Sequence, residues 1–218
     1  MKNKYDLIVF DLDGTLIDTL KDLNSAVNFA LSKNGYPTKD LEHTRRSIGN
    51  GVAMLIRRSV PDGIDERSYQ RVLSDFENHY RFHSSDMTTA YNGMKQVLEY
   101  LKEKKYLLAV STNKIEDVAM SLINHFYRGL FDAVVGDNGI RDKKPAPDSI
   151  NEIMRRLRVK DRSKIVYIGD TEVDHQTAVN SKVDCMLVTY GYRREVELAR
   201  FEFDDELIRS PIEIKQHF

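Results

Sequence analysis

The sequence lacks the features expected of a protein that works in an oxidising compartment, spans a membrane or binds a polyanion. Cys185 is its only cysteine, so no internal disulfide is possible and a reducing cytoplasm is the expected location. No apolar run approaches the length of a membrane span, and the run Leu7–Phe10 is too short for a signal peptide. The formal net charge is -1, which gives no reason to expect a nucleic-acid or membrane partner.

The composition is that of a globular protein with a packed core beneath a charged surface. Hydrophobic residues make up 41% of the chain and charged residues 31%. A length of 218 residues is too long for one typical domain and short for two, so a core domain with an inserted subdomain fits.

Five short apolar runs predict buried parallel strands, because strands covered on both faces are apolar throughout. Segments with helical periodicity lie between most of them. This alternation predicts an α/β fold with a Rossmann-like, doubly wound parallel sheet. The expected strands are Leu7–Phe10, Leu107–Val110, Ala133–Val135, Ile165–Ile168 and Met186–Val188.

One interval departs from this alternation. From about Ile17 to Ser85 there are helical patterns but no convincing strand. Gly14 and Thr15 precede the interval and a polar run follows it, so both edges are suitable hinges. We therefore expect an α/β core domain at 1–16 and 89–218, and a helical cap domain at 17–88.

Polar side chains stand at the ends of four of the expected strands. Each group alone has an ordinary explanation, such as a helix cap or a solvated turn. Together they bring acids, a hydroxyl and a lysine to the sheet edge where open α/β proteins bind ligands. The residues are Asp11 and Asp13, then Ser111, Thr112 and Asn113, then Lys143 and Lys144 before Pro145, and finally Asp170 and Asp174.

These four motifs resemble those of the haloacid dehalogenase superfamily of phosphatases. The resemblance implies that Asp11 attacks phosphorus and becomes an aspartyl phosphate, while Asp13 acts as general acid and then general base. It also implies a Mg2+ ion held by Asp11, the main-chain carbonyl of Asp13 and Asp170, with Asp174 ligating through water or orienting the site.

The remaining motif residues are implied to bind phosphate. Thr112, Asn113 and Lys144 would meet the oxygens of the transferred group, which carry the charge of the transition state. Lys143 is adjacent, but the family lysine directly precedes the proline, which favours Lys144.

Within the superfamily, the chain is most similar to the phosphoglycolate phosphatase group. The similarity lies in FDLDGTLID at Phe10–Asp18, SIGNGV at Ser47–Val52 and YGY at Tyr190–Tyr192. It implies a small phosphorylated metabolite as substrate. Arg45 or Arg46 could meet a substrate carboxylate, with a solvated helix face as the alternative.

Other activities stay open. A pyrophosphatase is the nearer rival, whereas a phosphosugar mutase is disfavoured because Leu23 stands where its histidine is expected. A dehalogenase would lack the acid at Asp13. An inactive metabolite-binding module would have lost motif residues, and none is lost. Asn92, Ser181 and Lys182 depart from the group's pattern.

Overall fold

The computed structural model describes residues 4–199 and 206–218. The chain forms two compact units. One is built from Met1–Ile17 and Ala90–Phe218, and the other from Asp18–Thr89. These divisions fall one residue after the expected ones. No helix of the described residues is both long enough and apolar enough to cross a bilayer.

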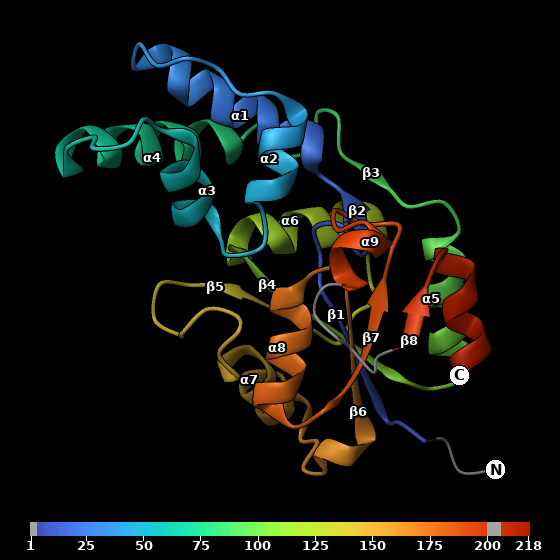
Figure 1. Ribbon diagram of the computed structural model, residues 1–218. Coiled ribbons are helices and arrows are strands. Elements are labelled where there is room, and N and C mark those ends of the chain that lie inside the picture. The colour runs from blue at the N-terminus through green and yellow to red at the C-terminus, as the bar shows by residue number, and fades with distance from the viewer. Residues whose placement is uncertain (1–3, 200–205) are drawn as a thin grey trace. The chain divides into compact units, whose positions relative to one another are not determined.

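The first unit is built on a six-stranded parallel sheet with the order β5-β4-β1-β6-β7-β8 (Figure 1). It confirms the predicted α/β class and all five expected strands. The sixth strand, β8, is only three residues long and left no apolar run to find. The strands are β1 (Leu7–Phe10), β4 (Leu107–Ile115), β5 (Ala133–Asp137), β6 (Ile165–Gly169), β7 (Asp184–Val188) and β8 (Glu206–Ile208).

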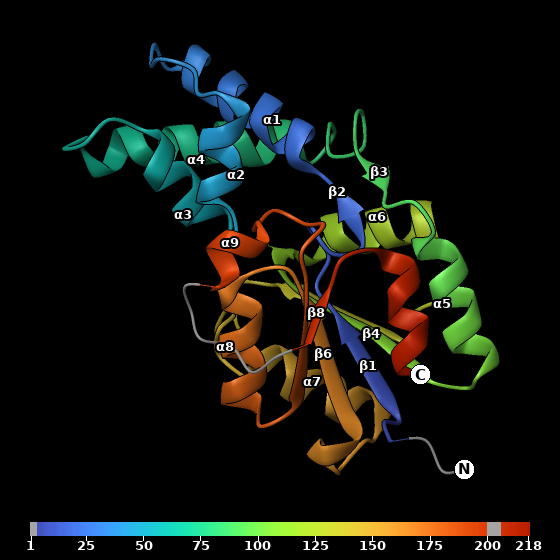
Figure 2. The ribbon, with the colours of Figure 1, turned by 45° about the vertical axis from the view of Figure 1, so that its right-hand side comes forward.

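Helices cover both faces of the sheet (Figure 2). On one face lie α5 (Met94–Glu103), α6 (Glu116–Tyr127) and the 3-10 helix Pro211–His217, and on the other lie α7 (Asp148–Leu157) and α8 (Glu172–Ser181). The described part of this unit also contains two short helices, Arg162–Lys164 and α9 (Glu195–Leu198). The switch of faces follows from right-handed crossovers that run first to one side of β1 and then to the other.

Strand β1 lies in the middle of the sheet, and Asp11 follows it at the carboxyl edge of the sheet. Leu7 and Val9 belong to the core cluster that includes Ile150 and Ile153 of α7, and alternation along the strand puts Asp11 on the same side. The Asp11 amide donates to the carbonyl of Ile168 in β6 at 2.9 Å, which fixes the chain at this point.

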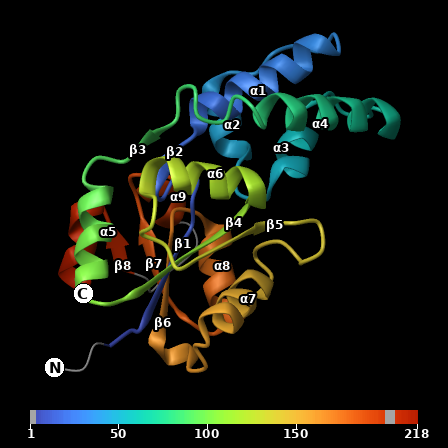
Figure 3. The ribbon, with the colours of Figure 1, turned by 180° about the vertical axis from the view of Figure 1, so that it is seen from behind.

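The second unit contains four helices, in the interval where the sequence shows helical periodicity. They are α1 (Leu20–Lys33), α2 (Leu41–Ser47), α3 (Val52–Ser59) and α4 (Glu66–Tyr80), and α1 packs along α4 (Figure 3). The chain enters and leaves through two paired strands of two residues each, β2 (Ile17–Asp18) and β3 (Thr89–Ala90). These strands are too short to leave a sequence pattern.

A buried carboxylate joins the two ends of the helical unit. Asp22 lies in the first turn of α1 and is 1% exposed. It accepts hydrogen bonds from the main-chain N–H of Met87 at 3.0 Å and of Thr88 at 2.8 Å, and the Thr88 hydroxyl lies 2.7 Å away. The returning chain is therefore fastened to the start of α1 by a charged acceptor.

Lys182 ends α8 in a left-handed conformation, with φ of 56°. A Cβ atom is strained there, and glycine is the residue that relieves this strain. We expect Lys182→Gly to raise the free energy of unfolding by about 1 kcal/mol, measured by urea denaturation. Lys182→Ala keeps the Cβ and should give no such gain; an equal gain in both variants would contradict backbone strain as the cause.

Candidate active site

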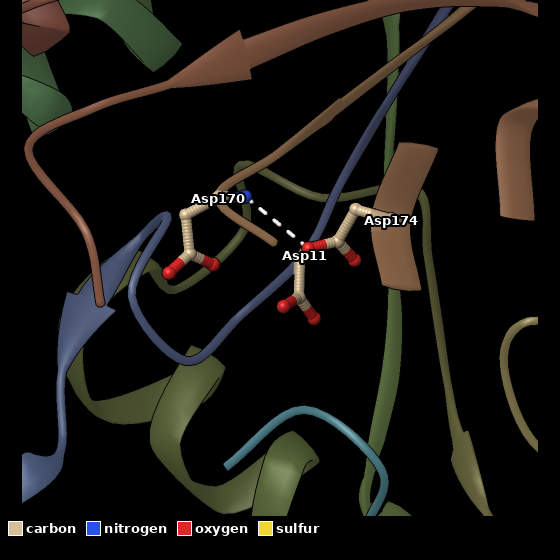
Figure 4. A group of neighbouring side chains, drawn as sticks. All are labelled: Asp11, Asp170 and Asp174. Atoms are coloured by element: carbon tan, nitrogen blue, oxygen red, sulfur yellow. Dashed lines mark hydrogen bonds between the residues drawn. The ribbon is translucent and has the colours of Figure 1, made fainter. Parts of the chain in front are cut away.

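Three buried carboxylates gather at the carboxyl edge of the sheet (Figure 4). Asp11 follows β1, Asp170 follows β6, and Asp174 lies in the first turn of α8. One oxygen from each can be chosen so that all three lie within 4.8 Å of one another. The structure thus brings together three acids that are up to 163 residues apart in the sequence.

Both carboxylate oxygens of Asp174 accept hydrogen bonds from neighbouring groups of the protein. Its Oδ2 accepts from the main-chain N–H groups of Asp170 (3.2 Å) and Thr171 (3.0 Å) and from the Thr171 hydroxyl (2.7 Å). Its Oδ1 lies 2.7 Å from Lys144 Nζ and 3.2 Å from the Tyr167 hydroxyl. A carboxylate has about four lone-pair sites, so this acid is already fully engaged as an orienting group.

Asp170 is held less completely. Oδ1 accepts from the Thr15 hydroxyl at 3.2 Å, and Oδ2 accepts from the main-chain N–H of Tyr192 at 2.7 Å. Each oxygen therefore keeps lone-pair capacity for a further ligand. Thr15 and Tyr192 come from the loops after β1 and β7, so the orientation of this acid depends on three separate segments.

Lys144 places a buried ammonium among these acids. Its Nζ lies 2.9 Å from Asp11 Oδ1 and 2.7 Å from Asp174 Oδ1. Its main chain is held by Asn113, whose amide accepts from Lys144 N at 2.8 Å and donates to Lys144 O at 3.0 Å. Lys143 turns away and pairs with Asp137 at 2.7 Å. The lysine next to Pro145 is thus the one beside Asp11.

Asp13 has a cationic partner of its own. The Lys114 ammonium lies 2.8 Å and 3.0 Å from its two carboxylate oxygens, and the Lys114 side chain is 3% exposed. Thr112 stands two residues before Lys114 on β4, and its hydroxyl accepts from the Lys114 main-chain N–H at 3.2 Å. Asp11 and Asp13 are therefore each in contact with a different lysine, Lys144 and Lys114.

The positive charges near the buried carboxylates do not fully neutralise them, as the pKa shifts of Asp11 and Asp170 indicate. Burial raises the pKa of Asp11 to about 7, with Lys144 opposing the shift and Asp174 adding to it. Burial, then the charges of Asp174 and Asp11, raise the pKa of Asp170 well above its ordinary value. A hard divalent cation prefers carboxylate oxygens and would remove this excess charge, so the residues fit such an ion.

Sequence reasoning gave no role to several residues that the fold brings to the site. Lys114 follows Thr112 and Asn113 directly in the sequence, and this position beside two expected site residues was the available signal. Tyr167 lies inside an apolar strand run and Tyr192 acts through its main chain. The apolar run does not distinguish Tyr167 from a core residue, and the YGY segment at Tyr190–Tyr192 does not indicate that a main-chain N–H meets Asp170.

In the helical unit, both candidate arginines are paired with one acid. Arg45 contacts both carboxylate oxygens of Glu42, at 2.8 and 2.9 Å, and Arg46 also contacts Glu42 at 2.8 Å. Arg45 is buried and Arg46 exposed. Arg58 donates to the Ser47 carbonyl at 2.8 Å and to the Asn50 side chain at 2.9 Å, which orders the glycine-containing loop between α2 and α3.

Residues 8–188 match the family of haloacid dehalogenase-like hydrolases. The chain belongs to this family. It is 34% identical over 192 residues to a phosphoglycolate phosphatase of Pseudomonas syringae, covering 85% of this chain and 70% of the relative. It is 32% identical over 193 residues to a phosphoglycolate phosphatase of Aliivibrio fischeri, covering 85% of each. A solved structure from Lactobacillus delbrueckii, proposed to be a phosphoglycolate phosphatase, superimposes with a TM-score of 0.91 at 29% identity over 98% of both chains.

The chain is therefore a phosphatase of the haloacid dehalogenase family. The match of the family begins at β1 and ends at β7, so it includes every strand that contributes an acid or a lysine to the site. The sequence-based resemblance is confirmed at the level of family and enzyme class.

Proposed function

We propose that this phosphatase hydrolyses a small phosphomonoester through an aspartyl phosphate on Asp11. The observation that carries the proposal is the state of the Asp11 carboxylate. Its Oδ1 lies 2.9 Å from Lys144 Nζ, yet it accepts no hydrogen bond of good geometry from the described residues. A buried, oriented oxygen with an available lone pair is what attack on phosphorus requires.

Asp13 is the proposed acid and base. It donates a proton to the leaving alkoxide as the P–O bond breaks, and then takes a proton from the water that attacks the aspartyl phosphate. The Lys114 ammonium contacts both of its oxygens and gives the side chain a defined direction. The same group therefore serves both half-reactions without moving between sites.

Lys144 and Thr112 are the proposed contacts of the phosphoryl oxygens, and Asn113 acts with them by holding the Lys144 main chain. The transition state spreads negative charge over three oxygens. A fixed ammonium in a buried setting stabilises that charge more than it would in water. Asn113 was expected to bind phosphate itself, and its amide pairing with Lys144 favours this supporting role.

Mg2+ is the proposed cofactor, held by Asp11, Asp170 and the main-chain carbonyl of Asp13. When bound, it supplies positive charge to the phosphoryl oxygens and to the attacking carboxylate. The engagement of Asp174 with four donors from Lys144, Asp170 and Thr171 favours its orienting role over direct ligation. We assign the helical unit, which the sequence placed at 17–88, the role of a cap that selects the substrate.

Removal of the ion is the first test. Hydrolysis of p-nitrophenyl phosphate is expected with MgCl2 and is expected to fall to background after EDTA treatment, then to return when Mg2+ is added in excess. Undiminished hydrolysis in EDTA would contradict the proposed cofactor.

A substrate panel tests the rest of the proposal. The named activity of the relatives favours phosphoglycolate over pyrophosphate, hexose phosphates and nucleotides. We expect the highest kcat/KM for a small carboxylated phosphomonoester. A wide lead for pyrophosphate would favour the pyrophosphatase alternative, and conversion of a hexose phosphate without phosphate release would favour the mutase.

Gly191 allows a close approach of three segments at the site. A Cβ atom at this position would lie 2.5 Å from Asp170 Cβ and 2.6 Å from Asp170 Oδ2, and would overlap the Gly14 carbonyl. We expect Gly191→Ala to lower the free energy of unfolding by about 1–3 kcal/mol. Its affinity for Mg2+ should fall about tenfold, measured by calorimetric titration, because Asp170 must shift.

Gly139→Ala is the matched control for this prediction. Unlike Gly191, Gly139 has a positive φ, 73°, and no atom lies within 4 Å of its added Cβ. It should lose stability from backbone strain while its Mg2+ affinity stays unchanged. Equal Mg2+ affinity in Gly191→Ala and the wild type would show that Asp170 does not hold the ion.

A further inference from the structure

Tyr167 lies at the centre of the site, although nothing in the proposed chemistry needs a phenol. It sits in β6 beside Val9 of β1 and is fully buried. Its hydroxyl is 3.0 Å from Lys144 Nζ, 3.0 Å from the Ser111 carbonyl and 3.2 Å from Asp174 Oδ1. A tyrosine that only filled the core would not need to place its oxygen among two charged groups.

The contacts of Lys144 leave one N–H bond for this hydroxyl. An ammonium has three N–H bonds and no acceptor. One is donated to Asp174 and one to the Tyr167 oxygen, while Asp11 Oδ1 lies 2.9 Å from the ammonium without a hydrogen bond of good geometry. Without that acceptor, one buried N–H would be unsatisfied, and the ammonium would be positioned only by the two carboxylates that compete for it.

The hydroxyl contributes an acceptor without adding charge. Burial holds the pKa of Tyr167 well above its ordinary value, so the group is a neutral phenol. Its proton can be donated to the Ser111 carbonyl of β4, which leaves an oxygen lone pair for Lys144. The phenol therefore connects the lysine to β4 and β6, the two strands that flank β1, and draws no charge away from Asp11.

We propose that Tyr167 is a positioning residue that sets the place of the Lys144 ammonium relative to Asp11 and the transferred phosphoryl group. This inference rests on the proposed function of Lys144. Asn113 holds the lysine at its main chain and Tyr167 holds it at its tip. Both ends of a flexible four-carbon side chain are then fixed, and a displacement of about 1 Å at such a group is costly to catalysis.

Tyr167→Phe keeps the ring and removes only the hydroxyl. With p-nitrophenyl phosphate and saturating Mg2+, kcat should fall about tenfold while KM changes less than about twofold, because the loss affects the chemical step. Tyr5→Phe is the matched control: its hydroxyl donates to Asp184 at 2.7 Å, at the opposite end of the sheet, and its kcat should be unchanged.

A second measurement follows Lys144 itself. We expect the 15N-1H signal of the Lys144 ammonium, assigned by its loss in Lys144→Arg, to be resolved in the wild type and in Tyr5→Phe and to broaden away in Tyr167→Phe. A kcat within twofold of the wild type, or a reduced kcat with an unchanged ammonium signal, would overturn the inference. No hydrolysis by the wild type would overturn the proposed function instead, and the ammonium signal would then decide alone whether Tyr167 holds Lys144.

Discussion

Asp11→Asn is expected to lower kcat for phosphomonoester hydrolysis by about four orders of magnitude or more. The amide has the shape of the carboxylate but cannot attack phosphorus, and loss of a nucleophile is among the largest single effects on an enzyme. Steady-state release of p-nitrophenol at saturating Mg2+ measures it. Incubation of the wild type with a 32P-labelled substrate, followed by an acid quench, should give labelled protein, and Asp11→Asn should give none.

The variant should stay folded, which separates a chemical loss from a structural one. Burial raises the pKa of Asp11, so the ionised carboxylate is unfavourable in the folded state at neutral and higher pH. A neutral amide avoids that cost, and the free energy of unfolding at pH 8 should be equal to or above that of the wild type. Substantial activity in freshly purified Asp11→Asn would refute the nucleophile assignment.

Lys144→Met is expected to have the largest effect on stability. It leaves the buried cluster of Asp11, Asp170 and Asp174 without the ammonium that contacts Asp11 and Asp174. Removing one partner of a buried ion pair costs about 3–5 kcal/mol, because the remaining charge is uncompensated. Urea unfolding at pH 8 in EDTA measures this loss. Lys143→Met is the matched control: its ion pair with Asp137 is partly exposed, and its loss should cost less than about 1 kcal/mol.

The loss in free energy of unfolding caused by Lys144→Met should depend on pH. A carboxyl whose folded pKa is raised binds more protons in the folded state than in the unfolded state, so stability falls as pH rises between the two pKa values. For Asp11 that window runs from about 4 to about 7 with Lys144 present, and it extends to higher pH without it. The deficit should therefore be smaller at pH 5 than at pH 8. A deficit that does not change with pH would contradict the role of Lys144 in compensating these acids.

The sheet and its edge could be predicted because each strand is marked by a short apolar run in the sequence. Leu7–Phe10 and Ile165–Ile168 are buried on both faces, so their apolar runs mark them directly. The acids follow those runs, and the parallel arrangement of the strands brings their ends together. Knowledge of the order of the strands was not needed, because every parallel strand ends at the same edge.

The partners within the site could not be predicted, because they depend on which side chain meets which across the sheet. The pairing of Lys114 with Asp13 and the saturation of Asp174 arise between residues of different segments. Strand β8 was not predicted because its three residues at the edge of the sheet are too few to form a recognisable apolar run. Hydrogen-bond partners are properties of the assembled fold.

The carboxylate of Asp22 has a consequence for how this protein can be changed. By fastening Met87 and Thr88 to the first turn of α1, it brings the entrance and exit of a 72-residue segment, Asp18–Thr89, next to each other. A segment with adjacent ends can be removed or replaced at little cost in loop closure. We therefore expect the helical unit to be exchangeable, because a short linker from Ile17 to Ala90 would leave the sheet and its acids on one continuous chain.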